Sequence, residues 1–300
     1  MQLENIYLKS LDKFGKGRFS PAQFAHLHGL SIQSSKVLIH RMGKNFQLFR
    51  AGRGEYVLLT AESFLKLQQL AKKNRVLHSM AIELFTLFPE LKALVLYGSQ
   101  VRGEADRFSD YDVLLILPEK LGETSGIRRR IEAKFRIKLH LTIYSENGYR
   151  NAVLSEPYIR FWLSEGLVLD EGGITRSPMP PIPKIAYEEW LSTAKTYTET
   201  ASESGAEKRG RYYLTALEIL GLIRSALKLS YDYGAVRKQL EGLLGSETLA
   251  RIRGGRRLGR GEEKLLEKTC KSEIAAINAL LRGIGYNEAD IYWKSRLAVA

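Results

Sequence analysis

The spacing of apolar residues changes twice along this chain of 300 residues. In residues 1–75 and 185–300 apolar side chains recur every three to four positions, which is the period of one face of an α-helix. Between these segments, continuous apolar runs at 92–97 and 113–117 are typical of buried β-strands. The pattern predicts an α+β protein with several domains: a helix-rich N-terminal segment, a small mixed sheet and a C-terminal helical bundle.

Two helices with clear start and end signals are expected in the N-terminal segment. Ser20 and Pro21 begin the first, because Ser caps free amides and Pro is tolerated at the first helical position, and Gly29 ends it. The second is expected from Ser31 to Met42. Its apolar face is predicted to contain Val37, Leu38 and Met42.

A β-hairpin is expected after these helices. Residues 46–50 and 55–59 have the composition of strands, and the glycines of segment 51–54 permit a tight turn between them. This order of helix, turn, helix and hairpin resembles the winged helix-turn-helix domain that begins many prokaryotic regulators and some antitoxins. With a connecting helix that starts at Ala61, the predicted first domain spans residues 1–74.

Positive charge is concentrated in this first segment. The net charge of the chain is +13, and residues 1–75 contain 13 basic and 4 acidic side chains, whereas residues 76–184 contain 14 of each. Excess positive charge beside a winged-helix pattern favours binding of DNA or RNA. The alternative is a winged helix that contacts another protein.

The resemblance also implies which residues contact nucleic acid. The second helix would enter the major groove with its first turns facing the base edges, through Gln33, Ser34, Ser35 and Lys36. Contacts with phosphate are expected at the end of that helix and on the hairpin, where the wing could also enter the minor groove; these residues are Arg41, Lys44, Arg50 and Arg53.

The segment that joins the two apolar strands carries the candidate chemistry. The first strand ends at Gly98, which lacks a Cβ and lets the backbone approach a phosphate. Ser99 is expected to cap a short helix and to offer its hydroxyl to the same phosphate. The sequence Ser-Asp-Tyr-Asp at 109–112 opens the second strand. Asp110 and Asp112 are two positions apart on a strand and therefore face the same side.

The paired carboxylates predict a divalent cation. Two adjacent carboxylates repel each other unless a cation joins them, and hard oxygen ligands that face a triphosphate favour Mg²⁺ or Mn²⁺. Two such ions could align an attacking oxygen with a leaving pyrophosphate. Arg102 could bind phosphate or pair with a nearby carboxylate, Glu104 or Asp106.

The spacing G-S-x2-R-G-x5-S-D-x-D at 98–112 resembles the motif of the DNA polymerase β-like nucleotidyltransferase superfamily. The match is closest to its minimal, aminoglycoside-type and antitoxin-type members. The resemblance implies a domain over residues 75–172 that transfers a nucleoside monophosphate from a triphosphate such as ATP to a hydroxyl acceptor. It implies that the triphosphate is held by Gly98, Ser99, Arg102 and Ser109, and that Asp110 and Asp112 are catalytic metal ligands.

The third carboxylate of that family is missing here. The family places it on the next strand, but the strand expected at 136–144 contains no acidic residue. His140 is the best match for the third position, and a neutral His can act as a general base near neutral pH. Glu146 lies just beyond the strand and is the alternative if a short loop returns it to the site.

The last segment is expected to be a helical bundle. It covers residues 185–300 and follows a Gly- and Pro-rich linker at 172–184. Such a bundle helps to bind the acceptor in some relatives. In others it has the HEPN fold, whose ribonuclease members use Arg-x4-His, but this segment contains no histidine. The basic, Gly-rich stretch 251–260 could bind nucleic acid or form a solvated loop.

Composition indicates where the protein works and with which partners. The single cysteine, Cys270, excludes an internal disulfide framework, and the absence of a long apolar run and of a signal-peptide pattern favours a cytoplasmic protein without a membrane partner. The expected function is metal-dependent nucleotidyl transfer to a protein hydroxyl, an RNA end or a small molecule, with DNA or RNA bound by the first domain. The alternative is a DNA-binding transcriptional regulator or antitoxin whose nucleotidyltransferase domain binds nucleotide or a partner without catalysis.

Overall fold

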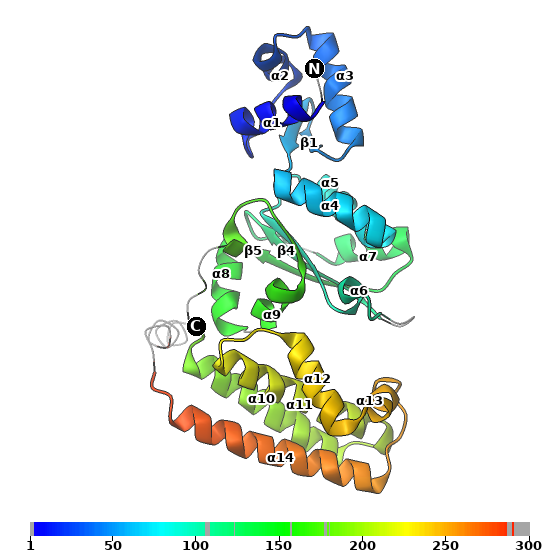
Figure 1. Ribbon diagram of the computed structural model, residues 1–300, viewed down its shortest axis with the longest axis vertical. Coiled ribbons are helices and arrows are strands. Elements are labelled where there is room, and N and C mark those ends of the chain that lie inside the picture. Colours follow the sequence, from blue (N-terminus) through cyan, green and yellow to red (C-terminus); the bar gives the residue numbers. More distant parts are fainter. Residues whose placement is uncertain are drawn as a thin grey trace. The chain divides into compact units, whose positions relative to one another are not determined.

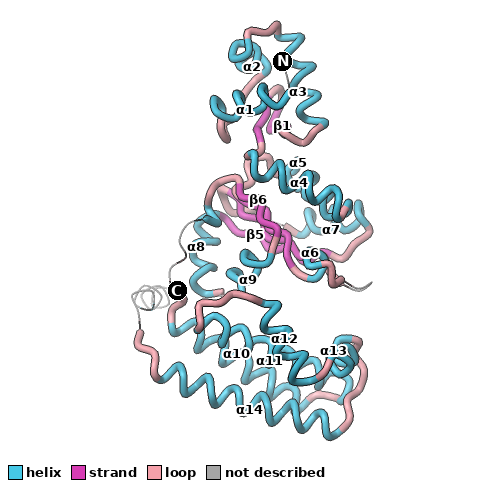
Figure 2. Tube along the Cα trace, viewed as in Figure 1, coloured by secondary structure: helices cyan, strands magenta, loops and turns pink. Residues whose placement is uncertain are grey.

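The computed structural model describes residues 3–105, 109–122, 124–156, 158–176, 179, 181–286 and 290. They belong to two compact units, Met1–Arg150 with Gly166–Pro178 and Asn151–Glu165 with Met179–Ala300. The first unit contains the N-terminal segment and a four-stranded sheet, and the second is helical (Figures 1 and 2). The chain is therefore a mixed α+β protein with a small mixed sheet. The division into three domains stays a prediction.

Three helices and a hairpin form the N-terminal segment: α1 (Leu3–Phe14), α2 (Pro21–His28), α3 (Ile32–Lys44), β1 (Leu48–Gly52) and β2 (Glu55–Leu58). Helix α2 begins with a capping box at Ser20 and ends at Gly29 in the left-handed conformation, as expected from the sequence. Helix α1 was not expected, and it adds Ile6 and Tyr7 to the core of this segment. Membership of the winged-helix class stays a prediction.

Helix α3 buries Met42 as predicted and packs Leu38 against the same core, but Val37 does not belong to its buried face. Its buried residues are Ser35, Ile39 and Met42, whereas Val37 is 45% exposed. Val37 lies two positions from Ser35 and from Ile39, which rotates it by about 200° to the opposite side of the helix. The Ser35 hydroxyl donates a hydrogen bond to the carbonyl oxygen of Pro21 at 3.0 Å. Ser35 is therefore part of the core and does not belong to the exposed face, which corrects the prediction.

The sheet has four strands in the order β5-β4-β3-β6: β3 (Ala93–Tyr97), β4 (Tyr111–Leu117), β5 (Leu139–Ser145) and β6 (Leu167–Asp170). Strand β3 is antiparallel to β4 and to β6, whereas β4 and β5 are parallel. Both apolar runs found in the sequence are strands. Strand β4 begins before its apolar run and includes Asp112.

Helices cover one face of this sheet: α4 (Ala61–Lys73), α5 (Arg75–Leu87) and α7 (Ser125–Phe135) (Figure 1). Leu94 and Leu96 of β3, and Val113 and Leu115 of β4, belong to the core formed with these helices. Neighbouring residues of a strand point to opposite faces. Tyr97 follows Leu96 and Asp112 precedes Val113, so both side chains lie on the face of the sheet that these helices do not cover. The polar residues of the motif therefore project away from the covering helices.

Glu171, directly after β6, forms hydrogen bonds and an ion pair with residues of the N-terminal segment. Its buried carboxylate accepts hydrogen bonds from the backbone nitrogen of Thr60 at 3.0 Å and from the Thr60 hydroxyl at 2.9 Å, and it pairs with Lys16. Phe49 of the hairpin stacks on Phe85 of α5 with ring centroids 5.4 Å apart. The N-terminal segment thus shares buried contacts with the sheet, so its removal would expose apolar surface of both.

The second unit contains the expected helical bundle. Helices α10 (Lys184–Glu203), α11 (Ala206–Leu227) and α14 (Arg260–Arg282) lie side by side, and α12 (Tyr233–Leu244) and α13 (Ser246–Arg253) pack on α11 (Figure 1). The unit also includes α9 (Tyr158–Glu165), while α8 (Glu146–Ser155) contains the boundary between the units. The predicted linker includes a 3₁₀ turn at Ile174–Arg176, and its positions 177, 178 and 180 lie outside the described residues. In the part of the chain that the structure describes, no helix is long and apolar enough to cross a membrane.

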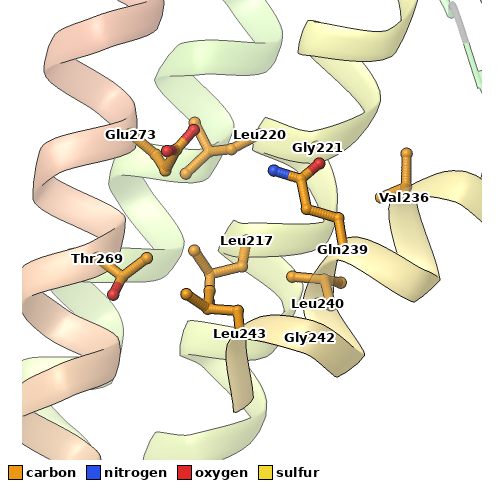
Figure 3. Close-up of a pocket in the computed structure, with 10 residues that line it drawn as sticks. All are labelled: Leu217, Leu220, Gly221, Val236, Gln239, Leu240, Gly242, Leu243, Thr269 and Glu273. Carbon is orange, nitrogen blue, oxygen red and sulfur yellow. The ribbon is translucent and has the colours of Figure 1, made fainter. Parts of the chain in front are cut away.

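A cavity of about 330 Å³ lies between α11, α12 and α14, and four of its ten lining residues are leucines (Figure 3). Gly221 of α11 faces Val236 of α12, and a Cβ at Gly221 would lie 2.6 Å from Cγ1 of Val236. Glycine therefore allows these helices to approach closely. Glu273 on the cavity wall accepts a hydrogen bond from Nε of Arg224 at 2.6 Å, so its charge is neutralised.

Candidate active site

Tyr97, Asp112 and His140 form a row across three neighbouring strands. Tyr97 and Asp112 are register partners on the antiparallel strands β3 and β4, and Asp112 and His140 are partners on the parallel strands β4 and β5. Residues that are partners in register project from the same face of a sheet. Oδ1 of Asp112 lies 3.2 Å from Nδ1 of His140. The structure therefore brings the residue predicted for the third position next to Asp112.

Asp110 stands at the entrance of β4, two residues before Asp112. Its Oδ2 accepts a hydrogen bond from Nζ of Lys138 at 2.8 Å. Its Oδ1 is buried and has no hydrogen-bond partner among the described residues. A buried polar atom without a partner is unfavourable by about 1–3 kcal/mol unless a further group binds it. Oδ1 of Asp110 is therefore an available ligand atom.

Gly98 makes room for the carboxylate of Asp112. Its φ is +78°, and a Cβ at this position would lie 2.1 Å from Oδ2 and 3.0 Å from Cγ of Asp112. Both the backbone conformation and this close approach favour glycine. The predicted capping role of Ser99 is wrong, because Gly98 is the N-cap residue of α6 (Ser99–Arg102) and this helix end has no side-chain cap hydrogen bond.

Arg102 and Ser109 flank the short connection between β3 and β4. Nε of Arg102 donates a hydrogen bond to Oε2 of Glu104 at 2.9 Å, which is one of the pairings expected from the sequence. The other expected partner, Asp106, lies outside the described residues. The carbonyl oxygen of Ser109 accepts a hydrogen bond from Nε2 of Gln100 at 3.4 Å.

Burial raises the pKa of two side chains in this row, Asp112 and Tyr97. Burial raises the pKa of Asp112, and the nearby charge of Asp110 raises it further, while the hydrogen bond and the charge of His140 oppose these effects. Burial, together with the charge of Asp112, also raises the pKa of Tyr97, so its hydroxyl stays protonated near neutral pH. A cation that bound Asp112 would oppose the effect of burial on this carboxylate.

Glu146 lies far from this row. Strands β4 and β5 are parallel, and β5 continues from His140, the partner of Asp112, for five residues to Ser145, a distance of about 17 Å. Helix α8 then begins at Glu146 itself, without a loop that returns toward Asp112, and the Glu146 carboxylate accepts a hydrogen bond from Arg150 at 3.0 Å. The alternative third group considered from the sequence is therefore not at the site.

Sequence reasoning missed Tyr97 and Lys138 as members of the site. The available signal was alternation: Lys138 and His140 are two positions apart, as are Asp110 and Asp112. Alternation shows that each pair faces one side, but only the register of β4 against β5 shows that the two pairs meet.

The two carboxylates fit a hard divalent cation. Mg²⁺ is usually held by one or two carboxylates and takes its other ligands from water and substrate phosphates. Asp110 and Asp112 supply such a donor set, including the buried Oδ1 of Asp110. No group of three or more His, Cys, Asp or Glu side chains among the described residues could hold a metal alone. The donors therefore match a cation that arrives with a phosphate ligand.

A family model and a solved structure are similar to parts of this chain. Residues 81–168 match the family model of the nucleotidyltransferase domain. This match includes the Gly98–Asp112 motif and His140, and it supports nucleotidyl transfer in general. A solved structure of spectinomycin adenyltransferase from Enterococcus faecialis, crystallised with ATP and spectinomycin, matches 72% of this chain and 99% of its own, at 12% sequence identity and a TM-score of 0.41. None of the curated proteins matches the sequence significantly.

The residues predicted to contact nucleic acid precede the segment 81–168 along the chain. All have exposed side chains on α3 or the hairpin: Gln33, Lys36, Arg41, Lys44, Arg50 and Arg53. Nε of Arg50 donates a hydrogen bond to the carbonyl oxygen of Gly52 at 2.9 Å, so this side chain lies along its own strand. Arg53 is in the two-residue turn of the hairpin, next to Gly54 with φ +76°.

Proposed function

We propose that this chain is a metal-dependent nucleotidyltransferase that moves a nucleoside monophosphate from a nucleoside triphosphate to a hydroxyl acceptor. The observation that carries the proposal is the pair Asp110 and Asp112 at the start of β4, close enough for the charge of Asp110 to raise the pKa of Asp112, within the segment that matches the nucleotidyltransferase model. The acceptor is a protein hydroxyl, an RNA end or a small molecule, and the protein works in the cytoplasm. The N-terminal segment binds DNA or RNA through the exposed side chains of α3 and the hairpin.

The nucleotide would bind beside Gly98. Gly98, Ser99, Arg102 and Ser109 would line the triphosphate, and Asp110 and Asp112 would hold Mg²⁺ or Mn²⁺ against it. When bound, the cation would neutralise phosphate charge and favour displacement at the α-phosphorus. The buried Oδ1 of Asp110 supports this arrangement, because a ligand on that atom removes an unfavourable unpaired oxygen.

His140 would receive the proton of the acceptor. The acceptor oxygen forms a bond to the α-phosphorus, the bond from that phosphorus to the pyrophosphate oxygen breaks, and the hydroxyl proton passes to the neutral imidazole. Nδ1 of His140 faces Asp112, which leaves Nε2 as the proton acceptor. The His140 side chain is 58% exposed, so an acceptor can reach it.

A second candidate function is supported by the basic partners of both carboxylates. Lys138 pairs with Asp110 and His140 lies against Asp112, so each carboxylate has a basic neighbour without a cation. The Tyr97–Asp112–His140 row contains a single carboxylate. These contacts favour a DNA-binding transcriptional regulator or antitoxin whose nucleotidyltransferase domain binds nucleotide or a partner without catalysis.

Calorimetric titration with ATP, with and without Mg²⁺, tests the shared part of both candidates. Asp112→Asn should abolish the Mg²⁺-dependent part of binding. Glu146→Gln is the matched control, since it neutralises a carboxylate at the other end of the sheet and should bind as the wild type does. Unchanged Mg²⁺-dependent binding by Asp112→Asn would overturn the proposal. Pyrophosphate release then separates the candidates, because only the enzyme releases it.

A further inference from the structure

An arginine-rich loop joins α13 to α14 in the second unit. Five of the ten residues at 251–260 are arginine and three are glycine. The functions argued above use none of them.

Apolar anchors fix this loop at both ends. Ile252 is 1% exposed and Leu258 is 5% exposed, and both belong to the core of the bundle. Leu258 packs on α11 at Gly210, where a Cβ would lie 3.0 Å from Cδ1 of Leu258. The backbone nitrogen of Arg256 donates to the carbonyl oxygen of Arg251 at 2.9 Å. The loop therefore presents its other side chains from a defined backbone.

Two of the arginines form ion pairs within the bundle, and the side chains of the other three are exposed to solvent. Arg251 pairs with Glu262, and a guanidinium nitrogen of Arg253 lies 3.6 Å from Oε1 of Glu218. The guanidinium groups without an ion pair or hydrogen bond among the described residues are those of Arg256, Arg257 and Arg260, and all three side chains are exposed.

A fourth cation lies beside them. Arg211 of α11 is exposed and donates a hydrogen bond to the carbonyl oxygen of Arg253 at 3.0 Å. A Cβ at Gly255 would lie 3.5 Å from the guanidinium of Arg211, so this side chain runs along the loop. Three exposed arginines within five positions of the chain, with Arg211 against the same loop, concentrate positive charge that a polyanion would neutralise.

Nucleic acid is the polyanion that this surface fits. Arginine forks match the oxygens of phosphate, and glycines allow the backbone to approach a phosphodiester chain. The apolar residues of the loop, Ile252 and Leu258, are buried, so the loop lacks the exposed apolar centre of a typical protein interface. We propose that the loop at 251–260, with Arg211, binds the phosphate backbone of a nucleic acid at a second site, distinct from α3 and the hairpin.

The test measures binding of the full chain to fluorescein-labelled single-stranded RNA and duplex DNA by anisotropy at several salt concentrations. The loop variant replaces Arg256, Arg257 and Arg260 with Ala. Its affinity should fall at least about tenfold at low salt, and the slope of log affinity against log salt should decrease by about 2–3, since each phosphate that is bound contributes about 0.7–0.9. The matched control replaces Lys228, Lys238 and Lys268, which are exposed in the same unit, with Ala and removes the same charge.

The two nucleic acids and the control decide the outcome. A loss in the loop variant that exceeds the loss in the control supports the proposal, and the larger of the RNA and DNA effects identifies the ligand. Equal losses in both variants would show a general effect of charge and overturn it, as would unchanged binding by the loop variant. The thermal midpoint of each variant should equal that of the wild type, because all six side chains are exposed.

Replacement of the three arginines with Lys, which keeps the charge, provides a second loop variant and should retain most of the salt slope. If the Lys variant lost as much of the salt slope as the Ala variant does, this result would also contradict phosphate binding by charge.

Discussion

Asp112 and His140 face each other across the parallel strands β4 and β5, with Nδ1 of His140 3.2 Å from Oδ1 of Asp112. We propose that His140 takes the position at which the family that the motif resembles has its third carboxylate. An imidazole there would accept a proton but would bind Mg²⁺ poorly.

The first prediction concerns His140→Asp. We expect faster pyrophosphate release, because Asp restores a carboxylate next to Asp112, and nearly unchanged affinity for the triphosphate. A well-placed general base contributes about 10²–10⁴-fold, which is the upper range for the gain. Single-turnover pyrophosphate release with Mg²⁺ and with Mn²⁺ measures the change. A slower Asp variant would contradict the assignment of His140 to the position of the missing carboxylate.

The second prediction compares Gly98→Ala with Gly103→Ala. Both glycines have positive φ, +78° and +75°, but Gly103 is in the left-handed helical region whereas Gly98, with ψ −168°, is in a region that only glycine adopts. Gly103→Ala should therefore lose about 1–2 kcal/mol of stability from backbone strain, and Gly98→Ala should lose more. A Cβ at Gly98 would also meet Oδ2 of Asp112, whereas a Cβ at Gly103 meets nothing within 4 Å. Only Gly98→Ala should therefore lose Mg²⁺-dependent binding of ATP in calorimetry. Equal loss of binding in both variants would indicate that strain, and not displacement of Asp112, is responsible.

The third prediction is a pH dependence of stability that arises from Asp112. Burial raises the pKa of Asp112 in the folded protein above its ordinary value of 3.8. The stability from this group is therefore present below that value and is lost as the pH rises through the folded pKa. Asp112→Asn has no group that titrates at this position, so it does not lose this stability as the pH rises. The thermal midpoint of the variant minus that of the wild type should therefore increase from pH 4 to pH 7, and it should be zero or positive at pH 7. Differential scanning fluorimetry without added metal measures it, and a difference that decreases with pH contradicts the assignment.

Local sequence patterns were sufficient for the sheet and for the aspartate pair. The run at 113–117 is continuous and apolar, so it predicts a buried strand without knowledge of its neighbours. The period of two then places Asp110 and Asp112 on one side. The pattern failed where serines are buried: Ser10 of α1 donates to the carbonyl of Ile6, and Ser35 of α3 is in the core. A polar residue on a buried face interrupts the apolar period.

The contacts between distant residues could not be predicted from the sequence. Lys138 and Asp110 are 28 positions apart, and the parallel register of β4 and β5 decides that they meet. A shift of that register by one residue would turn His140 away from Asp112. The place of Glu146 depends on structure in the same way, since only the start of α8 at that residue shows that no loop returns it to the site.

The fourth prediction concerns nucleic-acid binding by the N-terminal segment. Lys36→Ala, Arg41→Ala and Arg53→Ala, combined, should weaken binding to duplex DNA of any sequence. The salt slope should decrease by about 0.9 for each phosphate that the variant no longer binds. The control is Lys72→Ala with Lys73→Ala on α4, where both side chains are exposed. Anisotropy titrations at several salt concentrations measure the slope. A control that loses as much slope per charge as the test variant would contradict a specific role of α3 and the hairpin.

Transfer of label from the α-phosphate tests nucleotidyl transfer most directly. The wild-type protein is incubated with cell extract, Mg²⁺ and each of the four nucleoside triphosphates, labelled either at the α- or at the γ-phosphate. Relative to extract alone, we expect a macromolecule or small molecule to become labelled from the α-labelled triphosphate only, with release of pyrophosphate. Asp112→Asn should abolish this labelling and Glu146→Gln should retain it. Labelling from the γ-phosphate that depends on the added protein, or labelling from the α-phosphate that persists with Asp112→Asn, would contradict nucleotidyl transfer by this site.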